Sequence, residues 1–305
     1  MVPRISISTL PLDSQRVVRA IFFGAHAFQK SSFNFTTNDM VVIGGGAMSL
    51  LMMANDGEKL EEKTLMQWRS TTVMYNLWLY LRRDYSFVYQ DSDLVVKNKS
   101  TLSWSTHEQF ISAISWAFQS FSYEKLSGKG PSNGFQGKAR GSKNEIGFRA
   151  SVPTEKRAVT AEIDCTAYNE DYFDSLFENR TLAVTLEDDS GLEPILVNYA
   201  SPDTLLALKV FALSQRIRSK DVLDINSLLE FIKYKRNEFH FEPKRLDKLL
   251  VKVATHETPE AKVGKDTMIP WDKFWYNARK AAGKDLTQVI KAGLSELQIE
   301  FNTRK

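Results

Sequence analysis

Acidic residues occupy alternating positions in two apolar segments of this 305-residue chain. One segment is DSDLVV at residues 91–96, with Asp91 and Asp93, and the other is AEIDC at residues 161–165, with Glu162 and Asp164. Because successive side chains of a β-strand point to opposite faces, each pair of carboxylates would share one side of a strand. Carboxylate oxygens hold the magnesium ions of phosphoryl-transfer sites, so both segments are candidates for a metal-dependent catalytic site. A structural role stays open for each segment, as a turn or as an acidic strand edge.

Cationic residues recur at helical spacing in a segment that begins near Ser201. Lys209, Arg216 and Lys220 are spaced i, i+7 and i+11, which would place three cations along one side of about three helical turns. From spacing alone, a solvated basic face beside a hydrophobic core explains such a row equally well.

The same segment predicts a pair of helices. Ser201 is a favourable N-cap, Pro202 suits the first helical position, and Asp203 would meet the positive end of the helix dipole. The residues that would form the buried stripe of this helix are Leu205, Leu208, Ala212, Leu213 and Ile217. A second helix is predicted after Ser219, and its buried residues would be Val222, Ile225, Leu228 and Leu229.

A glycine cluster follows a short apolar run at residues 40–52, MVVIGGGAMSLLM. The pattern predicts a buried strand, a turn at Gly44, Gly45 and Gly46, and then a helix. Backbone N–H groups of such a turn, together with the helix N-terminus, can bind phosphate. Glycines are also common at strand-to-helix turns because they adopt positive φ angles, so the cluster alone does not identify a phosphate site.

These two segments, in this order, resemble nucleotidyltransferases of the bacterial abortive-infection toxin type, which belong to the polymerase-β-like superfamily. Residues 40–52 are similar to the strand, glycine pair and helix that open the family's catalytic domain. Residues 205–224, with LLALK, an alanine, an arginine and KDxxD, are similar to the helix pair that follows its catalytic sheet. The substrate-binding residues that the resemblance implies are Gly44, Gly45, Gly46, Lys209, Arg216 and Lys220.

The family's metal-binding strand has the pattern R-x-T-x-D-x-D, and its counterpart in this chain is RSTTVMYN at residues 69–76. Arg69 and Thr71 match the pattern, whereas Val73 and Tyr75 replace the two aspartates and cannot hold magnesium. This register implies a diverged site without a bound metal. Its candidate catalytic residues are Arg69 and the later acid Asp164, and Thr71 would bind substrate.

A second register for the metal-binding strand uses Asp91 and Asp93, together with Asp164. This segment lies about fifty residues after the glycine turn, and no R-x-T precedes it. For these reasons we prefer the first register, and we expect magnesium as a cofactor only if the second one holds.

Two basic segments are candidates for RNA binding. Residues 125–149 are rich in glycine and cations and predict a loop or hairpin, in which the RNA-binding candidates are Lys129, Lys138, Arg140 and Lys143. The second segment, IPWDKFWYNARKAAGK at residues 269–284, predicts a helix in which Trp271 and Trp275 are core residues or platforms for bases. A solvated basic surface without a ligand is the alternative for both.

Composition narrows the class of protein. At 305 residues and 43% hydrophobic, the chain can bury a substantial core. Its single cysteine, Cys165, excludes a disulfide framework and a cysteine-based zinc site, and the net charge of +3 does not by itself demand a nucleic-acid partner. Because there is no signal-peptide core and no apolar run long enough to span a bilayer, we expect a cytoplasmic protein without a membrane partner.

These patterns predict an α+β fold, with a small mixed β-sheet and flanking helices in residues 1–200 and a helical subdomain in residues 201–305. The first function hypothesis is a diverged nucleotidyltransferase-like protein, or pseudoenzyme, that binds or acts on a nucleotide or a tRNA-like RNA without a two-metal site. The second is an active magnesium-dependent nucleotidyltransferase, and the third is a non-catalytic regulatory module with a protein partner. The discriminating observation is whether Asp91 and Asp93 lie within about 5 Å of Asp164.

Overall fold

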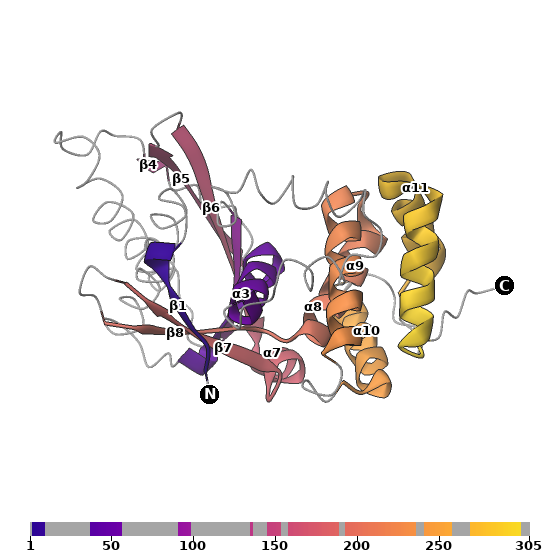
Figure 1. Ribbon diagram of the computed structural model, residues 1–305, viewed down its shortest axis with the longest axis horizontal. Coiled ribbons are helices and arrows are strands. Elements are labelled where there is room, and N and C mark those ends of the chain that lie inside the picture. The colour runs from indigo at the N-terminus through magenta and orange to yellow at the C-terminus, as the bar shows by residue number, and fades with distance from the viewer. Residues whose placement is uncertain are drawn as a thin grey trace. The chain divides into compact units, whose positions relative to one another are not determined.

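The structure is a computed structural model, and it describes residues 2–9, 37–56, 91–98, 135–136, 145–153, 158–188, 193–235, 241–257 and 269–299 (Figure 1). The chain divides into two compact units. The first consists of Met1–Lys59, Leu79–Asp174 and Thr181–Ala200, and the second of Leu60–Trp78, Ser175–Arg180 and Ser201–Lys305. Each unit is described by itself.

The first unit contains a mixed β-sheet. Its strands in the described residues are β1 (Arg4–Ser6), β2 (Met40–Ile43), β3 (Asp91–Asn98), β4 (Phe135–Gln136), β5 (Glu145–Pro153), β6 (Ala158–Asn169), β7 (Thr181–Glu187) and β8 (Ile195–Ala200). They form one eight-stranded sheet in the order β1-β7-β8-β2-β3-β6-β5-β4. The pairs β1–β7, β2–β8 and β3–β6 are parallel, whereas β2–β3, β4–β5, β5–β6 and β7–β8 are antiparallel. Short 3-10 helices, η1 (Ile7–Thr9) and η3 (Thr37–Asp39), follow β1 and precede β2.

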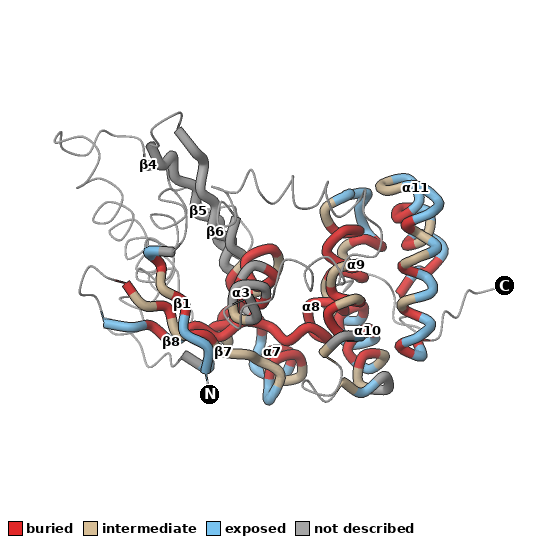
Figure 2. The backbone as a smooth tube through the Cα atoms, in the orientation of Figure 1, coloured by how far each residue is buried: buried red, intermediate tan, exposed pale blue. Residues whose placement is uncertain are grey.

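Apolar runs form the middle of this sheet. In β2 and β3, Val41 and Val95 have no exposed surface, because helix α3 (Gly44–Asp56) packs against both strands. The apolar face of α3 contributes Leu50 and Leu51, which are also fully or almost fully buried (Figure 2). As predicted, a buried strand ends at Ile43 and a helix follows, but the three glycines form the first turn of that helix instead of a separate turn before it.

The segment from 170 to 180 is helix α7 (Glu170–Phe177) and a turn. In the first unit, Lys97 of β3 lies 2.7 Å from Asp174 and 3.1 Å from Glu170. The hydrogen bonds to these two carboxylates outweigh partial desolvation and raise the pKa of Lys97. This ion pair fastens the start of α7 to the strand that carries Asp93.

The second unit contains four longer helices among the described residues, which are α8 (Pro202–Gln215), α9 (Ser219–Tyr234), α10 (Pro243–Glu257) and α11 (Trp271–Glu296). Helix α8 packs against each of the other three, and α11 also packs against α9. This central position explains why Leu205, Leu206 and Val210 of α8 are fully buried (Figure 2). In α9, the predicted buried residues Val222, Ile225, Leu228 and Leu229 are confirmed.

The predicted start of α8 is confirmed, with Ser201 at the N-cap and Pro202 in the first turn. The side chain of Ser201 does not cap the helix backbone; it contacts the carboxylate of Asp203 instead. Asp203 accepts the N–H of Thr204 at 3.0 Å and lies 3.1 Å from Arg245 of α10, so it links the N-terminus of α8 to a neighbouring helix.

The predicted buried stripe of α8 does not extend as far as the sequence suggested. Leu213 is fully buried, but Ile217 is 55% exposed. The reason is that α8 ends at Gln215, and Arg216 adopts an extended conformation with φ of −140° and ψ of 154°. The helical period therefore stops before position 217, and Ile217 lies in the connection to α9.

The predicted α+β fold is confirmed. It contains a mixed sheet with flanking helices, and further helices follow the sheet along the chain. Within the described residues, each helix is too short or too polar to cross a lipid bilayer.

Candidate functional site

The acidic residues singled out in the sequence lie on two neighbouring parallel strands. In the pairing of β3 with β6, Asp91 is in register with Glu162 and Asp93 is in register with Asp164. Neighbouring strands of a sheet lie about 4.8 Å apart, and positions in register share one face. The four acidic positions are therefore adjacent on one face of the sheet.

The next strand, β5, distinguishes the two acids of β6. Arg149 of β5 is in register with Glu162, whereas Gly147 is in register with Asp164. Register-paired positions of opposite charge generally attract one another, and the Glu162 position has such a basic neighbour in sequence. The position beside Asp164 carries no side chain on the β5 side. In this register, Asp164 has the acidic position of Asp93 on one side and a glycine position on the other.

The N-terminus of α3 lies against Asp93. Gly44 has a φ of 63°, in the left-handed region that favours glycine. A Cβ atom at this position would lie only 1.9 Å from Oδ2 of Asp93. The half-buried carboxylate of Asp93 therefore uses the space that a side chain at position 44 would need. Of the three glycines, Gly44 is the one that this geometry requires.

The electrostatics of this sheet face favour a cation. Several carboxylates at neighbouring positions repel one another, and a divalent ion removes that repulsion by accepting their oxygens as ligands. The positive end of the α3 dipole beside Asp93 offsets part of the same charge. Among the side chains that the structure describes, which include Asp93 but not its three acidic neighbours, no group of three or more potential metal ligands occurs.

Several predicted site residues lie outside the described residues. They are Arg69 and Thr71 of the first register and the RNA-binding candidates Lys129, Lys138, Arg140 and Lys143. Their predicted roles stay predictions. Within the basic segment 125–149, the structure describes β4 and the first part of β5. These two strands form an antiparallel pair.

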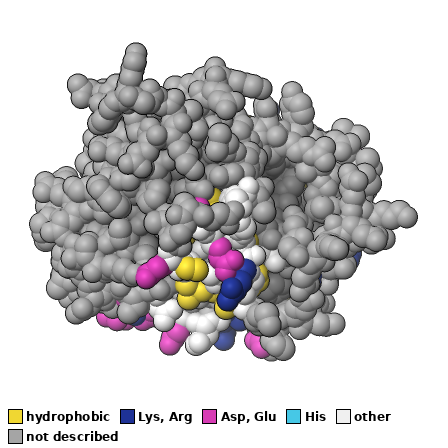
Figure 3. Space-filling view, turned by 60° about the vertical axis from the view of Figure 1, so that its left-hand side comes forward, with side chains coloured by type: hydrophobic (Ala, Val, Ile, Leu, Met, Phe, Trp, Pro, Cys, Tyr) yellow, Lys and Arg dark blue, Asp and Glu magenta, His cyan; other side chains and the backbone are white. Residues whose placement is uncertain are grey.

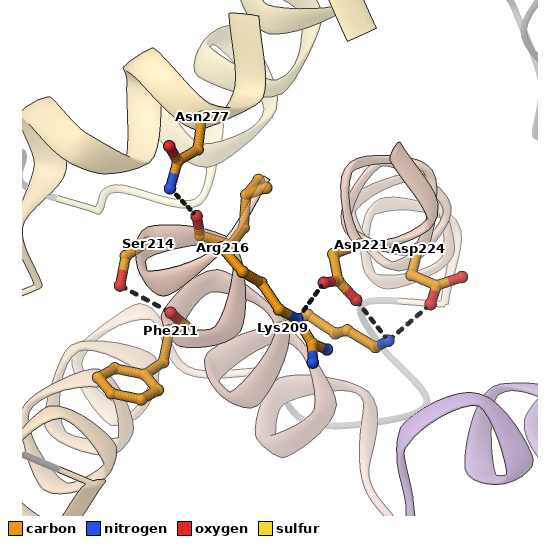
Figure 4. Close-up of polar contacts among 8 residues, drawn as sticks. Lys209, Phe211, Ser214, Arg216, Asp221, Asp224 and Asn277 are labelled. Carbon is orange, nitrogen blue, oxygen red and sulfur yellow. Dashed lines mark hydrogen bonds and ion pairs between the residues drawn. The ribbon is translucent and has the colours of Figure 1, made fainter. Parts of the chain in front are cut away.

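The cation predicted to bind a triphosphate, Lys209, lies in a buried ion cluster within the second unit (Figure 4). Its Nζ atom is 3.1 Å from Oδ1 of Asp221 and 2.8 Å from Oδ2 of Asp224. Arg216 Nε lies 3.0 Å from the other oxygen of Asp221. Desolvation by itself lowers the pKa of Lys209, but the two carboxylates outweigh it, and the pKa is raised.

This cluster changes the arrangement expected for the three cations of the segment. Lys209 lies in α8, Arg216 follows the end of α8, and Lys220 lies in the first turn of α9, so they do not form one row along a continuous helix. Lys209 and Arg216 instead converge on Asp221, which is fully buried. The KDxxD pattern showed that Asp221 and Asp224 share one helix face, at i and i+3, but not which cations they would meet. Substrate binding by the three cations stays a prediction.

Comparison with known proteins finds one matching family and similar solved structures. A family model described as nucleotidyl transferase AbiEii toxin, type IV TA system, matches residues 93–300. The search of curated proteins finds no match. Among solved structures, the chain is similar to JHP933 from Helicobacter pylori, with 12% identity, a TM-score of 0.41 and coverage of 94% of this chain and 90% of that one. It is also similar to a candidate nucleotidyltransferase from H. pylori, with 13% identity, a TM-score of 0.41 and coverage of 94% and 96%.

Proposed function

Because the chain belongs to the family of nucleotidyl transferase AbiEii toxins, we propose that it is a magnesium-dependent nucleotidyltransferase. Its metal-binding acids in this proposal are Asp93 and Asp164, with Asp91 beside them. The observation that carries the proposal is the parallel register of β3 and β6, in which Asp93 is opposite Asp164. Positions in register on neighbouring strands lie about 4.8 Å apart, which supports the second register of the metal-binding strand.

The residues around Asp93 support a site for a nucleoside triphosphate. The backbone N–H groups at Gly44 to Gly46 and the positive end of α3 suit phosphate oxygens. Magnesium held by the carboxylates would neutralise the triphosphate and activate an attacking hydroxyl group. Asp93, packed against Gly44, has little freedom to turn away, which keeps one ligand oriented before any ion binds.

The competing hypothesis is a diverged protein that uses Arg69 and Asp164 without metal. The proposal does not need Arg69 or Thr71, so the two registers differ in which replacement matters. A protein partner is also part of the proposal, since the matching family is defined as one component of a toxin–antitoxin system.

The test is transfer from labelled nucleoside triphosphates to total cellular RNA or protein, with and without Mg²⁺. Asp93→Asn and Asp164→Asn should each lower the rate by more than about 100-fold, because they remove direct ligands and even outer-shell changes cost 10 to 100-fold. The matched control is Asp171→Asn, an exposed aspartate of α7. Activity that survives Asp93→Asn but requires Arg69 would contradict the proposal and favour the first register.

A further inference from the structure

The connection between α8 and α9 and one side of α11 together form a basic surface on the second unit. We define this junction surface by six residues, which are Arg216, Ile217 and Arg218 from the connection and Lys273, Tyr276 and Lys280 from α11. All six residues are exposed. The surface is therefore available to a ligand as far as the described residues are concerned.

Hydrogen bonds hold the two parts of the junction surface together. Asn277 Nδ2 donates to the carbonyl of Leu213 at 2.7 Å (Figure 4), Lys273 Nζ donates to Gln215 at 3.5 Å, and Ser219 Oγ donates to the carbonyl of Ala281 at 2.7 Å. The three partners on α11, at positions 273, 277 and 281, are spaced i, i+4 and i+8 and form one row along the helix. The connection is thus fixed along two turns of α11, with its own exposed side chains beside those of the helix.

The charge of these segments is strongly positive. Residues 216–220 and 271–284 contain seven cations and one acid, Asp272. Arg216 shares the buried Asp221 with Lys209. Within the part of the chain that the structure describes, Arg218 and Lys280 have no carboxylate partner. On the face shown in Figure 3, most of which is not described, a basic side chain near the centre lies beside an acidic one.

An exposed aromatic ring lies within this positive region. Tyr276 is 57% exposed, and the Nζ atom of Lys280 is 5.8 Å from the centre of its ring. The tryptophans of the same helix are oriented differently, because Trp271 is buried and stacks with Trp275 at 5.9 Å. Trp271 therefore belongs to the core, which is one of the two sequence interpretations. Trp275 is half-buried beside it, and Tyr276 is the most exposed aromatic ring among the described residues of this helix.

We propose that the junction surface binds a single-stranded nucleic acid. Its arginines and lysines would contact phosphates, and Tyr276 would stack on a base, which is the combination that single-strand binding sites use. An acidic protein would satisfy the cations but would make no specific use of an exposed ring. The proposal goes beyond the transferase proposal, because binding at this surface requires neither magnesium nor Asp93.

The test is binding of a labelled oligouridine of about 12 nucleotides to the full chain, measured by fluorescence anisotropy at about 50 to 200 mM salt. Arg218→Gln with Lys280→Gln should lower the salt slope by about 1.4, at about 0.7 for each phosphate contact with a single strand. Tyr276→Ala should weaken binding roughly fivefold or more, whereas Tyr276→Phe keeps the ring and should bind like the unmodified protein. The charge-matched control is Lys252→Gln with Lys291→Gln, two exposed lysines outside the surface.

Three results would overturn the proposal. One is the absence of oligouridine binding at low salt, and another is a control variant that lowers the slope as much as the junction variant. The third is equal binding of polyglutamate with no effect of Tyr276→Ala, which would assign the surface to an acidic protein. The anisotropy measurement is repeated with Asp93→Asn, which should bind oligouridine normally. The nucleic-acid proposal is thereby tested separately from the transferase proposal. Loss of oligouridine binding in Asp93→Asn would place the oligonucleotide at the acidic site and would likewise contradict the proposal.

Discussion

Replacing Gly44 with alanine tests the close approach between the start of α3 and Asp93. The new Cβ atom would lie 1.9 Å from Oδ2 and 3.0 Å from Cγ of Asp93, whereas ordinary van der Waals contact lies at 3.4–4 Å. The carboxylate must therefore rotate away from the helix N-terminus. Alanine also disfavours the backbone conformation at this position, where φ is 63°.

The expected loss of stability combines three terms. The left-handed backbone costs an L-residue roughly 1–2 kcal/mol. A displaced, off-rotamer Asp93 costs about 0.5–1.5 kcal/mol, and loss of its interaction with the dipole of α3 costs about 0.3–1 kcal/mol. The free energy of unfolding should therefore fall by about 2–4 kcal/mol in Gly44→Ala.

Gly283 supplies a matched control, because its φ is 82° but a Cβ atom there would meet nothing within 4 Å. Gly283 has a ψ of 178°, a conformation that essentially only glycine adopts, so Gly283→Ala should show a backbone term alone of about 1–3 kcal/mol. Both variants are measured by urea unfolding with linear extrapolation, using probes in each compact unit, since the two glycines belong to different units. Magnesium-dependent transfer is measured in parallel and should fall in Gly44→Ala but not in Gly283→Ala.

A loss of stability below about 1 kcal/mol in Gly44→Ala, with transfer unchanged, would refute this reasoning. It would mean that Asp93 turns away from Gly44 without cost and that its orientation does not matter for the site. Preserved stability with lost transfer would support the steric argument while showing that the energetic terms are too large.

Two further predictions concern the buried ion cluster. Lys209→Met should lower the free energy of unfolding by about 3–5 kcal/mol in a urea titration, because it leaves the buried carboxylates of Asp221 and Asp224 without this cation. The control is Lys233→Met, which breaks an exposed ion pair with Glu296 whose 3.1 Å distance equals that between Lys209 and Asp221. It should lower the free energy of unfolding by at most about 1 kcal/mol. Because the pKa of Lys209 is raised in the folded protein, its stabilising effect is complete below the ordinary value of 10.5 and is lost as the pH rises through the higher folded-state value. The stability gap between the unmodified protein and Lys209→Met should therefore narrow above pH 10.5, and a gap that does not depend on pH would show that the charge of Lys209 is not what stabilises the cluster.

Features with local causes could be predicted from the sequence. The run MVVI followed by glycines contains both the apolar residues of a buried strand and the residue type that a positive φ requires. The strand β2 and a following helix were therefore predicted, although α3 begins at Gly44 itself and not after the glycines. Ser201 and Pro202 likewise mark the start of α8 through preferences of the first helical turn. The apolar period that seemed to reach Ile217 failed because the end of α8 has no strong stop signal in the sequence, such as a glycine.

The acidic site and the ion cluster depended on tertiary structure. The sequence shows the alternating spacing of the two acidic pairs, which are Asp91 with Asp93 and Glu162 with Asp164. It does not show how the two strands pair, because strand pairing is non-local. A register shift of one residue would place the two pairs on opposite faces of the sheet. The parallel register of β3 and β6 decided that the position of Asp93 lies opposite that of Asp164. In the same way, the composition of α8 and α9 determined that both helices would form, whereas their packing decided that Lys209 pairs with Asp221 and Asp224. The sequence by itself thus determined which residues have chemistry to offer, and long-range packing determined which of them meet, because contacts between distant segments leave no periodic trace along the chain.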